Sequence, residues 1–279
     1  MLKRERLMRI QEMIAEKGIV TASEIINALG VSDMTVRRDL DELEKNGKLI
    51  RIHGGAQSLD YNIDYELSHL QKATVKVEEK LAIAKAAVDR VGEHETIFLG
   101  PGTTIEMMAQ LLKERNVRVI TPSLAAFEAL KEKQDDQILL VGGSYRSNTK
   151  AFCGPLANQV VASMKFNKAF ISCNGIADNS ITTSSMEEGE LQKIACNNAK
   201  TVYLLADDHK FNREDFYVYY SLHNIDEVIT DDQVSEDTLD HYRQFTSITV
   251  APSRDQADEI REGNKADQPE LTEQASRAK

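Results

Sequence analysis

The chain has 279 residues, of which 41% are hydrophobic and 28% are charged, and its formal net charge is −11 at pH 7. No run approaches the roughly 18 consecutive apolar residues of a membrane span, and the charged stretch from Met1 to Arg6 is not followed by the apolar segment of a signal peptide. The composition therefore favours a two-domain cytoplasmic protein that has no membrane partner.

The acidic balance argues against nucleic acid as a partner for most of the chain, but not for its N-terminal part. Residues 1–57 carry 10 Lys+Arg and 9 Asp+Glu, whereas the remainder has a balance of −12. A polyanion is bound by cations gathered on one face, so the regional distribution matters more than the sum. DNA binding is therefore expected within residues 1–57.

Helical spacing of apolar residues and well-placed capping residues predict three short helices in this region. The predicted elements are helices over 2–17, 22–29 and 33–45 and a strand over 49–53. Gly30 is suited to end the second helix, Ser32 to cap the third, and Gly54-Gly55 to turn the strand into a hairpin. The short link between the second and third helices is typical of a helix-turn-helix, so residues 1–57 are predicted to form a winged helix-turn-helix.

The third predicted helix has one apolar face, formed by Val36, Leu40 and Leu43. Its other face carries arginines, which pair with guanine, and side chains that contact thymine methyl groups. The residues expected to contact DNA are Ser32, Met34, Thr35, Arg37 and Arg38, together with Arg51, His53 and Gly54 of the wing. An alternative is that Arg37 and Arg38 form a solvated face paired with acidic neighbours. Their position in a complete winged motif favours the DNA interface.

The polar residues 58–74 are predicted to be a linker. Short apolar strands then alternate with helices, which indicates a mostly parallel sheet covered on both faces, an α/β domain over 75–250. The predicted strands are 96–99, 117–120, 138–141, 168–173, 201–205, 227–230 and 247–250, and the predicted helices are 78–91, 105–112, 125–131, 156–164, 186–198 and 234–242. Apolar periodicity stops at Ala251, so 251–279 are expected to form a disordered tail.

The three cysteines, Cys153, Cys173 and Cys196, all fall in this second domain and are widely spaced. They form no Cys-x-x-Cys pair and have no neighbouring His cluster, so neither a disulfide framework nor a metal site is expected. A catalytic thiol is an alternative, but lone cysteines with apolar neighbours are usually buried packing residues.

The segment Gly100-Pro101-Gly102-Thr103-Thr104 links the strand 96–99 to a helix. Such a loop can offer backbone N–H groups and hydroxyls to an anion, although a tight turn is an alternative, and it is not a P-loop. Other polar residues follow further strands, and ligands of open α/β sheets bind at those strand ends. The expected effector-binding residues are Lys80, Gly100, Gly102, Thr103, Thr104, Thr121, Ser123, Tyr145, Arg146, Asn174, Asp207 and Lys210. Among them Lys80, Arg146 and Lys210 are the candidate phosphate-binding cations.

The segment Val31-Ser32-Asp33-Met34-Thr35-Val36-Arg37-Arg38-Asp39-Leu40, followed by Leu43-Glu44, Gly47 and His53-Gly54-Gly55-Ala56, resembles the signature of the DeoR family of bacterial repressors. The resemblance extends to about residue 251. It implies a repressor without enzymatic activity that binds double-stranded operator DNA. It also implies a sensor domain similar to ribose-5-phosphate isomerase and a small phosphorylated sugar as effector. Winged domains usually bind paired half-sites, so a homo-oligomer is expected.

The glycine loop departs from the usual family pattern. Most members have Asp-Ser-Gly-Thr-Thr there, and this chain has Gly100-Pro101 in place of Asp-Ser. That variant resembles the branch of the family that represses lactose operons. The resemblance implies tagatose 6-phosphate or a related phosphorylated sugar as the effector, and no cofactor.

The rival hypothesis is a sugar-phosphate isomerase with an appended DNA-binding domain. Isomerisation through an enediol needs a carboxylate base. The isomerase pattern has paired aspartates around a glycine, and here Asn174 replaces the first. Gln192, before Lys193-Ile194, stands where the isomerase has its catalytic Glu. We therefore expect no catalytic residues. A third hypothesis, a protein-interaction adaptor, leaves the polar residues at the strand ends without a role.

Overall fold

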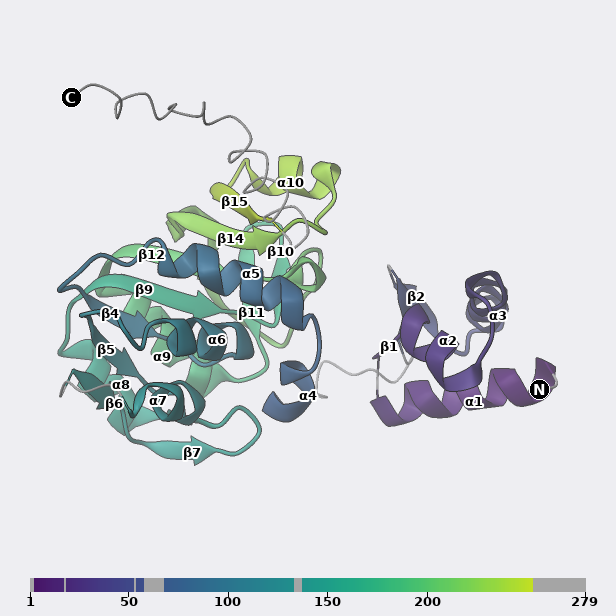
Figure 1. Ribbon diagram of the computed structural model, residues 1–279, viewed down its shortest axis with the longest axis horizontal. Helices are drawn as coiled ribbons and strands as arrows, with labels where there is room; N and C mark the ends of the chain where they lie inside the picture. Colours follow the sequence, from purple (N-terminus) through teal and green to yellow (C-terminus); the bar gives the residue numbers. More distant parts are fainter. Residues whose placement is uncertain (1–2, 18, 53, 58–67, 133–136, 253–279) are drawn as a thin grey trace, which may run out of the picture. The chain divides into compact units, whose positions relative to one another are not determined.

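The computed structural model of the chain describes residues 3–17, 19–52, 54–57, 68–132 and 137–252 (Figure 1). The chain divides into two compact units, Met1–Glu66 and Leu67–Lys279. None of the helices in the described ranges is long and apolar enough to cross a membrane. Each unit has its own hydrophobic core, so the two are described separately below.

The first unit is a winged helix-turn-helix. Its elements are α1 (Lys3–Lys17), β1 (Ile19–Thr21), α2 (Ala22–Leu29), α3 (Asp33–Lys45), β2 (Ile50–Ile52) and β3 (Gly55–Gln57). The strands form an antiparallel sheet in the order β1-β3-β2, so β1 adds a third strand to the predicted hairpin. Ile10, Ile25, Val36, Leu40 and Leu49 form the centre of the core and are at most 2% exposed.

Capping residues fix the geometry of the helix-turn-helix. The Thr21 side chain accepts a hydrogen bond from the Glu24 amide at 3.2 Å, and the Glu24 carboxylate accepts one from the Thr21 amide at 2.8 Å. This reciprocal pair starts α2, and Gly30 ends it with a positive φ of 63°. The Ser32 side chain accepts a hydrogen bond from the Thr35 amide and so starts α3. Only the short segment Gly30 to Ser32 therefore separates the two helices.

The second unit is built on a parallel sheet of seven strands, in the order β15-β14-β12-β9-β4-β5-β6. The strands are β4 (Thr96–Leu99), β5 (Arg118–Thr121), β6 (Ile138–Leu140), β9 (Phe166–Ser172), β12 (Ala199–Leu205), β14 (Glu227–Asp231) and β15 (Ser247–Ala251). The predicted fold class, an N-terminal helix-turn-helix followed by a mostly parallel α/β sheet, is confirmed.

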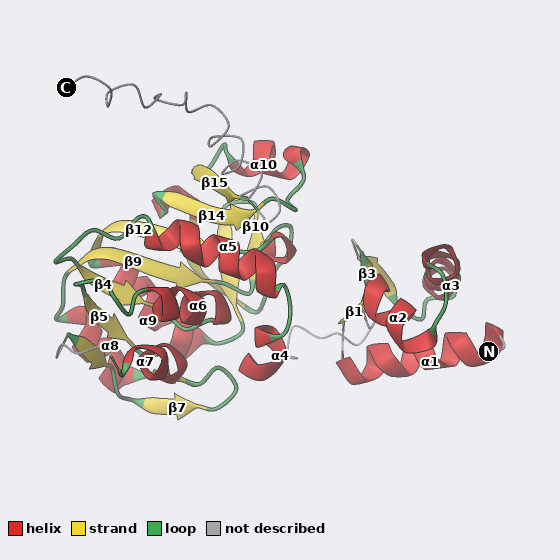
Figure 2. Ribbon diagram, viewed as in Figure 1, coloured by secondary structure: helices red, strands yellow, loops and turns green. Residues whose placement is uncertain are grey.

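Helices cover both faces of this sheet (Figure 2). One face packs on α5 (Val77–Val88), α6 (Thr103–Leu111) and α7 (Leu124–Leu130), and the other on α8 (Pro155–Ala162), α9 (Met186–Asn197) and Tyr242 of α10 (Glu236–Tyr242). The central strands are mostly apolar because alternate side chains enter opposite cores. On β4, for example, Ile97 and Leu99 enter one core and Phe98 enters the other.

Several short elements were not predicted from the sequence. They are α4 (His69–Ala73), the hairpin β7 (Ser144–Arg146) and β8 (Ala151–Cys153), the antiparallel sheet of β10 (Gly175–Ala177), β11 (Ser180–Thr183) and β13 (Tyr217–Ser221), and the 3₁₀ turns η1 (Asp208–Lys210) and η2 (Leu222–Asn224). Each of these elements has only three to five residues, which is too short to show a clear periodicity, so sequence patterns reveal them poorly.

Two domain boundaries, those of the linker and of the C-terminal tail, differ from the ones predicted from the sequence. Residues 69–73 lie in the predicted linker but form α4, which Ser68 and Gln71 start with a reciprocal pair of hydrogen bonds. At the other end, Ala251 belongs to β15 and is 1% exposed, so it is not part of a tail. The rest of the predicted linker, 58–67, and the rest of the predicted tail, 253–279, lie outside the described residues.

The strand order reverses between β4 and β9. From β4 the chain proceeds through β5 and β6 toward one edge, and from β9 it proceeds through β12, β14 and β15 toward the other. The connections therefore diverge at the carboxyl ends of β4 and β9, and in open α/β sheets this reversal creates the ligand-binding crevice. The fold thus identifies the residues after β4, β9 and β12 as the place to look for a site.

Candidate DNA interface and effector site

The structure places the apolar face of α3 in the core and its basic face at the surface. Val36 and Leu40 are buried, whereas Met34 is 65% exposed. Arg37 and Arg38 are exposed on the same side of the helix. A helix that presents arginines from its first turns in this way can enter the major groove and pair with base edges.

The basic groups around α3 differ in how they are held. Arg37 forms an ion pair with Asp33 at 2.8 Å. Arg51 of the wing donates to Asp41 Oδ1 at 2.6 Å and to the backbone oxygen of Arg37 at 3.2 Å, so it fastens the wing to α3. Arg38 lines an open hollow on this side of the unit. The other lining residues include the cations Lys3, Arg6 and Lys45, the acidic residues Asp39, Asp41 and Glu42, and Met34 and Thr35.

The remaining predicted DNA contacts have clear places as well. Ser32 is exposed where it caps α3. Gly54 is exposed in the turn between β2 and β3, with a positive φ of 76° that favours glycine. His53 lies outside the described residues.

A buried ion pair that sequence reasoning missed joins α1 to α3. Arg6 binds Asp39 through two nitrogens, and its Nη2 lies 3.0 Å from Asp39 Oδ1. The hydrogen bonds to Asp39 raise the pKa of Arg6 above its ordinary value. The sequence does contain a signal, because Asp39 falls on the same helical face as Val36, Leu40 and Leu43 and must be buried with them. A bidentate pair of this kind fixes the orientation of α3 relative to α1.

In the second unit, the loop after β4 requires glycine at position 102. A Cβ at Gly102 would lie 2.3 Å from Ser172 Oγ, and its φ of 143° disfavours any side chain. The Ser172 hydroxyl donates to the Pro101 oxygen at 2.8 Å, and the Gly100 amide donates to the Phe170 oxygen at 2.9 Å. These contacts hold the loop against the end of β9.

The loop also shapes the start of α6. Gly102 is the N-cap residue and supplies no capping side chain, while Thr103 and Thr104 in the first turn are 7% and 5% exposed. The first N–H groups of a helix that lacks a side-chain cap can be satisfied by a bound anion. The loop is therefore suited to bind an anionic group at the point where the strand order reverses.

Three lysines gather near this reversal, and we call Lys72, Lys80 and Lys210 the lysine cluster. Lys80 of α5 is 5% exposed, and its Nζ donates to the backbone oxygens of Lys72 and Val75, both at 2.6 Å. Burial lowers the pKa of Lys80 to about 8, nearby Asp207 opposes the shift, and the charges of Lys210 and Lys72 add to it. The cluster therefore brings three ammonium groups together beside the carboxylates of Asp207 and Glu79.

Asn174, after β9, connects the cluster to an acidic side chain. Lys72 Nζ donates to Asn174 Oδ1 at 3.0 Å, and Asn174 Nδ2 donates to Asp215 Oδ2 at 2.8 Å. Neither Lys72 nor Asp215 was predicted from the sequence. Lys72 lies in the segment predicted to be a linker, and Asp215 precedes the unpredicted strand β13. Ordered polar groups of this kind can bind the hydroxyls of a sugar.

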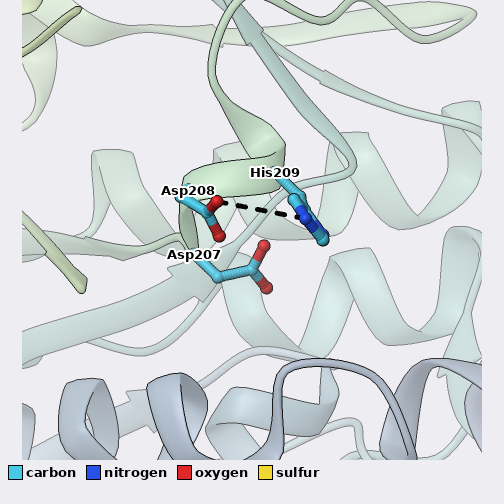
Figure 3. A group of neighbouring side chains, drawn as sticks. All are labelled: Asp207, Asp208 and His209. Carbon is cyan, nitrogen blue, oxygen red and sulfur yellow. Dashed lines mark ion pairs between the residues drawn. The ribbon is translucent and has the colours of Figure 1, made fainter. Parts of the chain in front are cut away.

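After β12, Asp207 directly precedes the turn η1, and Lys210 is the last residue of that turn. Asp207, Asp208 and His209 have ligand atoms within 4.8 Å of one another (Figure 3). Asp208 pairs with Lys76 at 3.2 Å, and its amide donates to Asp231 Oδ2 at 2.8 Å. Burial raises the pKa of Asp231 to about 6, partly against backbone hydrogen bonds. The acidic groups therefore face the lysines of the chain itself, and we assign no metal to them.

Four further predicted effector residues are engaged elsewhere. The fully buried Thr121 donates to the Leu99 oxygen at 2.7 Å and accepts from the Ser123 amide at 3.0 Å, while Ser123 caps α7. These bonds give both residues a structural role in the turn after β5. On β7, Tyr145 is half exposed and packs on Phe152, and Arg146 lies 3.4 Å from Glu188.

Sequence comparisons match both units to one family. Residues 6–62 match the family described as the DeoR-like helix-turn-helix domain, and residues 75–232 match the DeoR C terminal sensor domain. The lactose phosphotransferase system repressor of Lactococcus lactis subsp. lactis is 44% identical over 254 residues, which cover 90% of this chain and 100% of the relative. Its counterpart from Streptococcus mutans is 43% identical over 250 residues, 89% of this chain and 99% of the relative.

Similar solved structures include ribose 5-phosphate isomerase A from Methanocaldococcus jannaschii, with a TM-score of 0.36 and 19% identity over 47% of this chain and 53% of the isomerase chain. A mutant of RipA has a TM-score of 0.42 and 11% identity over 78% of this chain and 60% of the RipA chain. The matches to both family domains, together with relatives of more than 40% identity over nearly the whole chain, show that the protein belongs to the DeoR family of DNA-binding transcriptional regulators.

Proposed function

We propose that this protein represses a lactose-catabolic operon and that a phosphorylated sugar controls its binding to the operator, with tagatose 6-phosphate as the first candidate. The observation that carries the proposal is the lysine cluster, in a unit whose glycine loop lies where the order of the parallel strands reverses. The similarity to lactose phosphotransferase system repressors supports the choice of operon.

The chemistry of this site suits a sugar phosphate. A phosphate dianion is attracted by ammonium groups and by the first N–H groups of α6. The Asn174 amide can donate and accept hydrogen bonds, and the carboxylates of Asp207 and Asp215 can accept them from sugar hydroxyls. Because residues 58–279 have a charge balance of −12, an anion is attracted by this local cluster and not by the unit as a whole.

On the DNA side, the exposed face of α3 supplies base contacts, and the wing lies beside it. Winged domains usually bind paired half-sites as dimers, so we propose that the protein acts as a homo-oligomer on a symmetric operator. The spacing of the half-sites then reports the separation of two recognition helices.

Fluorescence anisotropy tests the proposal. Labelled DNA from upstream of lactose-catabolic genes should bind about 10³-fold more tightly, or better, than a scrambled duplex at the same salt concentration. This is the lower end of the ratio between specific and non-specific binding for transcriptional regulators. Tagatose 6-phosphate should change the operator affinity by about fivefold or more. Tagatose and inorganic phosphate are the matched controls and should have weaker effects. Failure of every phosphorylated sugar to alter DNA binding would contradict the proposed control.

The isomerase hypothesis leads to a different result and is tested separately. At positions 174 and 192 the chain has amides, which cannot act as the carboxylate base of an enediol mechanism. Gln192 is 3% exposed, and its Oε1 has no hydrogen-bond partner among the described residues. Coupled assays with ribose 5-phosphate and tagatose 6-phosphate should therefore show no turnover. An enzymatic rate that disappears in Lys80→Met would favour the isomerase instead.

A further inference from the structure

Helix α4 is the first described element after the segment 58–67, which joins the two units in sequence. Polar contacts attach it to the second unit. The His69 amide donates to the Asn148 oxygen at 2.7 Å, and His69 Nε2 lies 2.9 Å from Glu106 Oε2 on α6. Leu70 is 68% exposed, so apolar burial contributes little through this side chain. The position of α4 therefore depends strongly on polar partners.

Two further polar partners of α4, Lys80 and Asn174, belong to the effector site described above. Lys80 donates to the backbone oxygens of Lys72 and Val75 at the C-terminal end of α4. Asn174 accepts a hydrogen bond from the Lys72 ammonium group at 3.0 Å. The same groups that are placed to bind a phosphorylated sugar thus also hold α4.

We propose that Lys72 is itself an effector-binding residue, whose ammonium group joins those of Lys80 and Lys210 around the phosphate, so that bound effector fastens α4 to the carboxyl ends of β9 and β12. The proposal rests on the proposed function, because it concerns the site where the phosphorylated sugar binds. It adds a ligand contact that comes from outside the α/β sheet and lies next to the connection between the two units.

The charges in this region support an anion at that point. Buried Cys173, at the end of β9, is within electrostatic reach of both Lys210 and Lys72, and of Asp207 and Asp215. Lys80 is likewise affected by Lys210 and Lys72. Like charges that are held close together and partly buried repel one another, and a bound dianion removes that repulsion. Lys72 already points to this centre through its bond to Asn174.

The short length of α4 makes it sensitive to such a contact. A helix of five residues is not stable by itself in water, so its tertiary contacts decide how firmly it is held. An effector that binds Lys72 adds a charged contact to this small set.

Calorimetric titration of the full chain with tagatose 6-phosphate tests the contact. Lys72→Met keeps the length of the side chain and removes its charge, and it should weaken binding by about 10- to 100-fold, the loss expected for one charged hydrogen bond. Lys72→Arg should retain most of the affinity. Lys85→Met removes an exposed lysine from α5 and is the matched control, which should bind as the unmodified protein does.

Amide hydrogen exchange supplies a second readout, which is independent of the measured affinity. Tagatose 6-phosphate should slow exchange in residues 68–75 of the unmodified chain, and Lys72→Met should lose most of this protection. Unchanged affinity in Lys72→Met, or unchanged exchange in α4 when effector is bound, overturns the role of Lys72. An unmodified chain that binds none of the phosphorylated sugars fails earlier and overturns the proposed function itself.

Discussion

Gln192 Oε1 occupies the space that a side chain at position 100 would need. A Cβ on Gly100 would lie 2.9 Å from this oxygen, which is closer than real Cβ contacts. Gln192 is 3% exposed on α9, where the core gives it little freedom to move. The glycine in the loop after β4 and the amide on α9 are therefore complementary in size.

This complementarity predicts coupled stability effects. Gly100→Ala should destabilise the second unit by about 1–3 kcal/mol, because it overpacks a filled region. The same change should cost less when Gln192→Ala has already removed the opposing oxygen. The coupling free energy should be about 0.5–3 kcal/mol, and urea unfolding of the four members of the double-mutant cycle measures it. Strictly additive effects would show that the two residues do not constrain each other.

Much of the fold was predictable because local signals agreed with the tertiary structure. Gly30 ends α2 and Ser32 caps α3 where expected, and the strand over 96–99 has the predicted bounds. The parallel sheet follows from the alternation of apolar strands and helices. These features depend on residues close together in sequence, which a pattern can register.

The site was less predictable because its partners come from distant segments. Lys72 reaches Asn174 across 102 positions, and it lies in a polar stretch that forms only a short helix. Thr121 has the right residue type at the end of a strand, but its hydroxyl completes a buried turn. Sequence patterns locate strand ends and do not show which polar groups are already satisfied there.

Arg38 is predicted to contribute directly to operator recognition. Arg38→Ala should weaken specific binding by about 1–3 kcal/mol and relax base preference at one position, because the exposed guanidinium can pair with a guanine. The fold should survive, since the side chain is exposed on the face of α3 opposite the core. Fluorescence anisotropy with a set of single-base operator variants measures both effects.

A matched variant separates base recognition from loss of charge. Arg9→Ala on α1 removes the same charge from a side chain that is 65% exposed and pairs with Glu12. It should leave base preference intact. If Arg38→Ala bound the operator as tightly as the unmodified protein, the assigned recognition face would be wrong.

The pKa of Lys80 predicts how effector binding depends on pH. Burial lowers this pKa from 10.5 to about 8, so the unfolded chain binds more protons than the folded chain between these values. Lys80 therefore reduces folding stability below pH 8, and stability recovers as the pH rises through this window. Effector affinity should change in the opposite sense, because a phosphate dianion needs the charged ammonium.

Affinity for tagatose 6-phosphate should thus be highest between about pH 6, where a sugar phosphate loses its second proton, and pH 8. Above pH 8 it should fall by up to about tenfold per pH unit, as one proton must be taken up. Titration calorimetry at several pH values, in buffers of different ionisation enthalpy, measures both quantities. In Lys80→Arg the fall above pH 8 should disappear, because arginine stays charged. An alkaline fall that persists in this variant would have another origin.

The C-terminal limit of the second unit predicts the effect of truncation. Ala251 is buried in β15 and pairs with Asp231, so a chain that ends at Pro252 keeps the whole parallel sheet. Residues 253–279 contain five cations, seven anions and only Ile260 and Leu271 as large apolar residues. We expect so few apolar residues to add little to the core of the second unit, and we expect their small net charge to be screened at physiological salt. The shortened chain should therefore retain the melting temperature, effector affinity and operator affinity of the full chain.

A chain that ends at Thr246 lacks β15 and should melt at a lower temperature, which makes it the matched control. A fall in oligomer size or melting temperature for the chain that ends at Pro252 would show that the last 27 residues are structural.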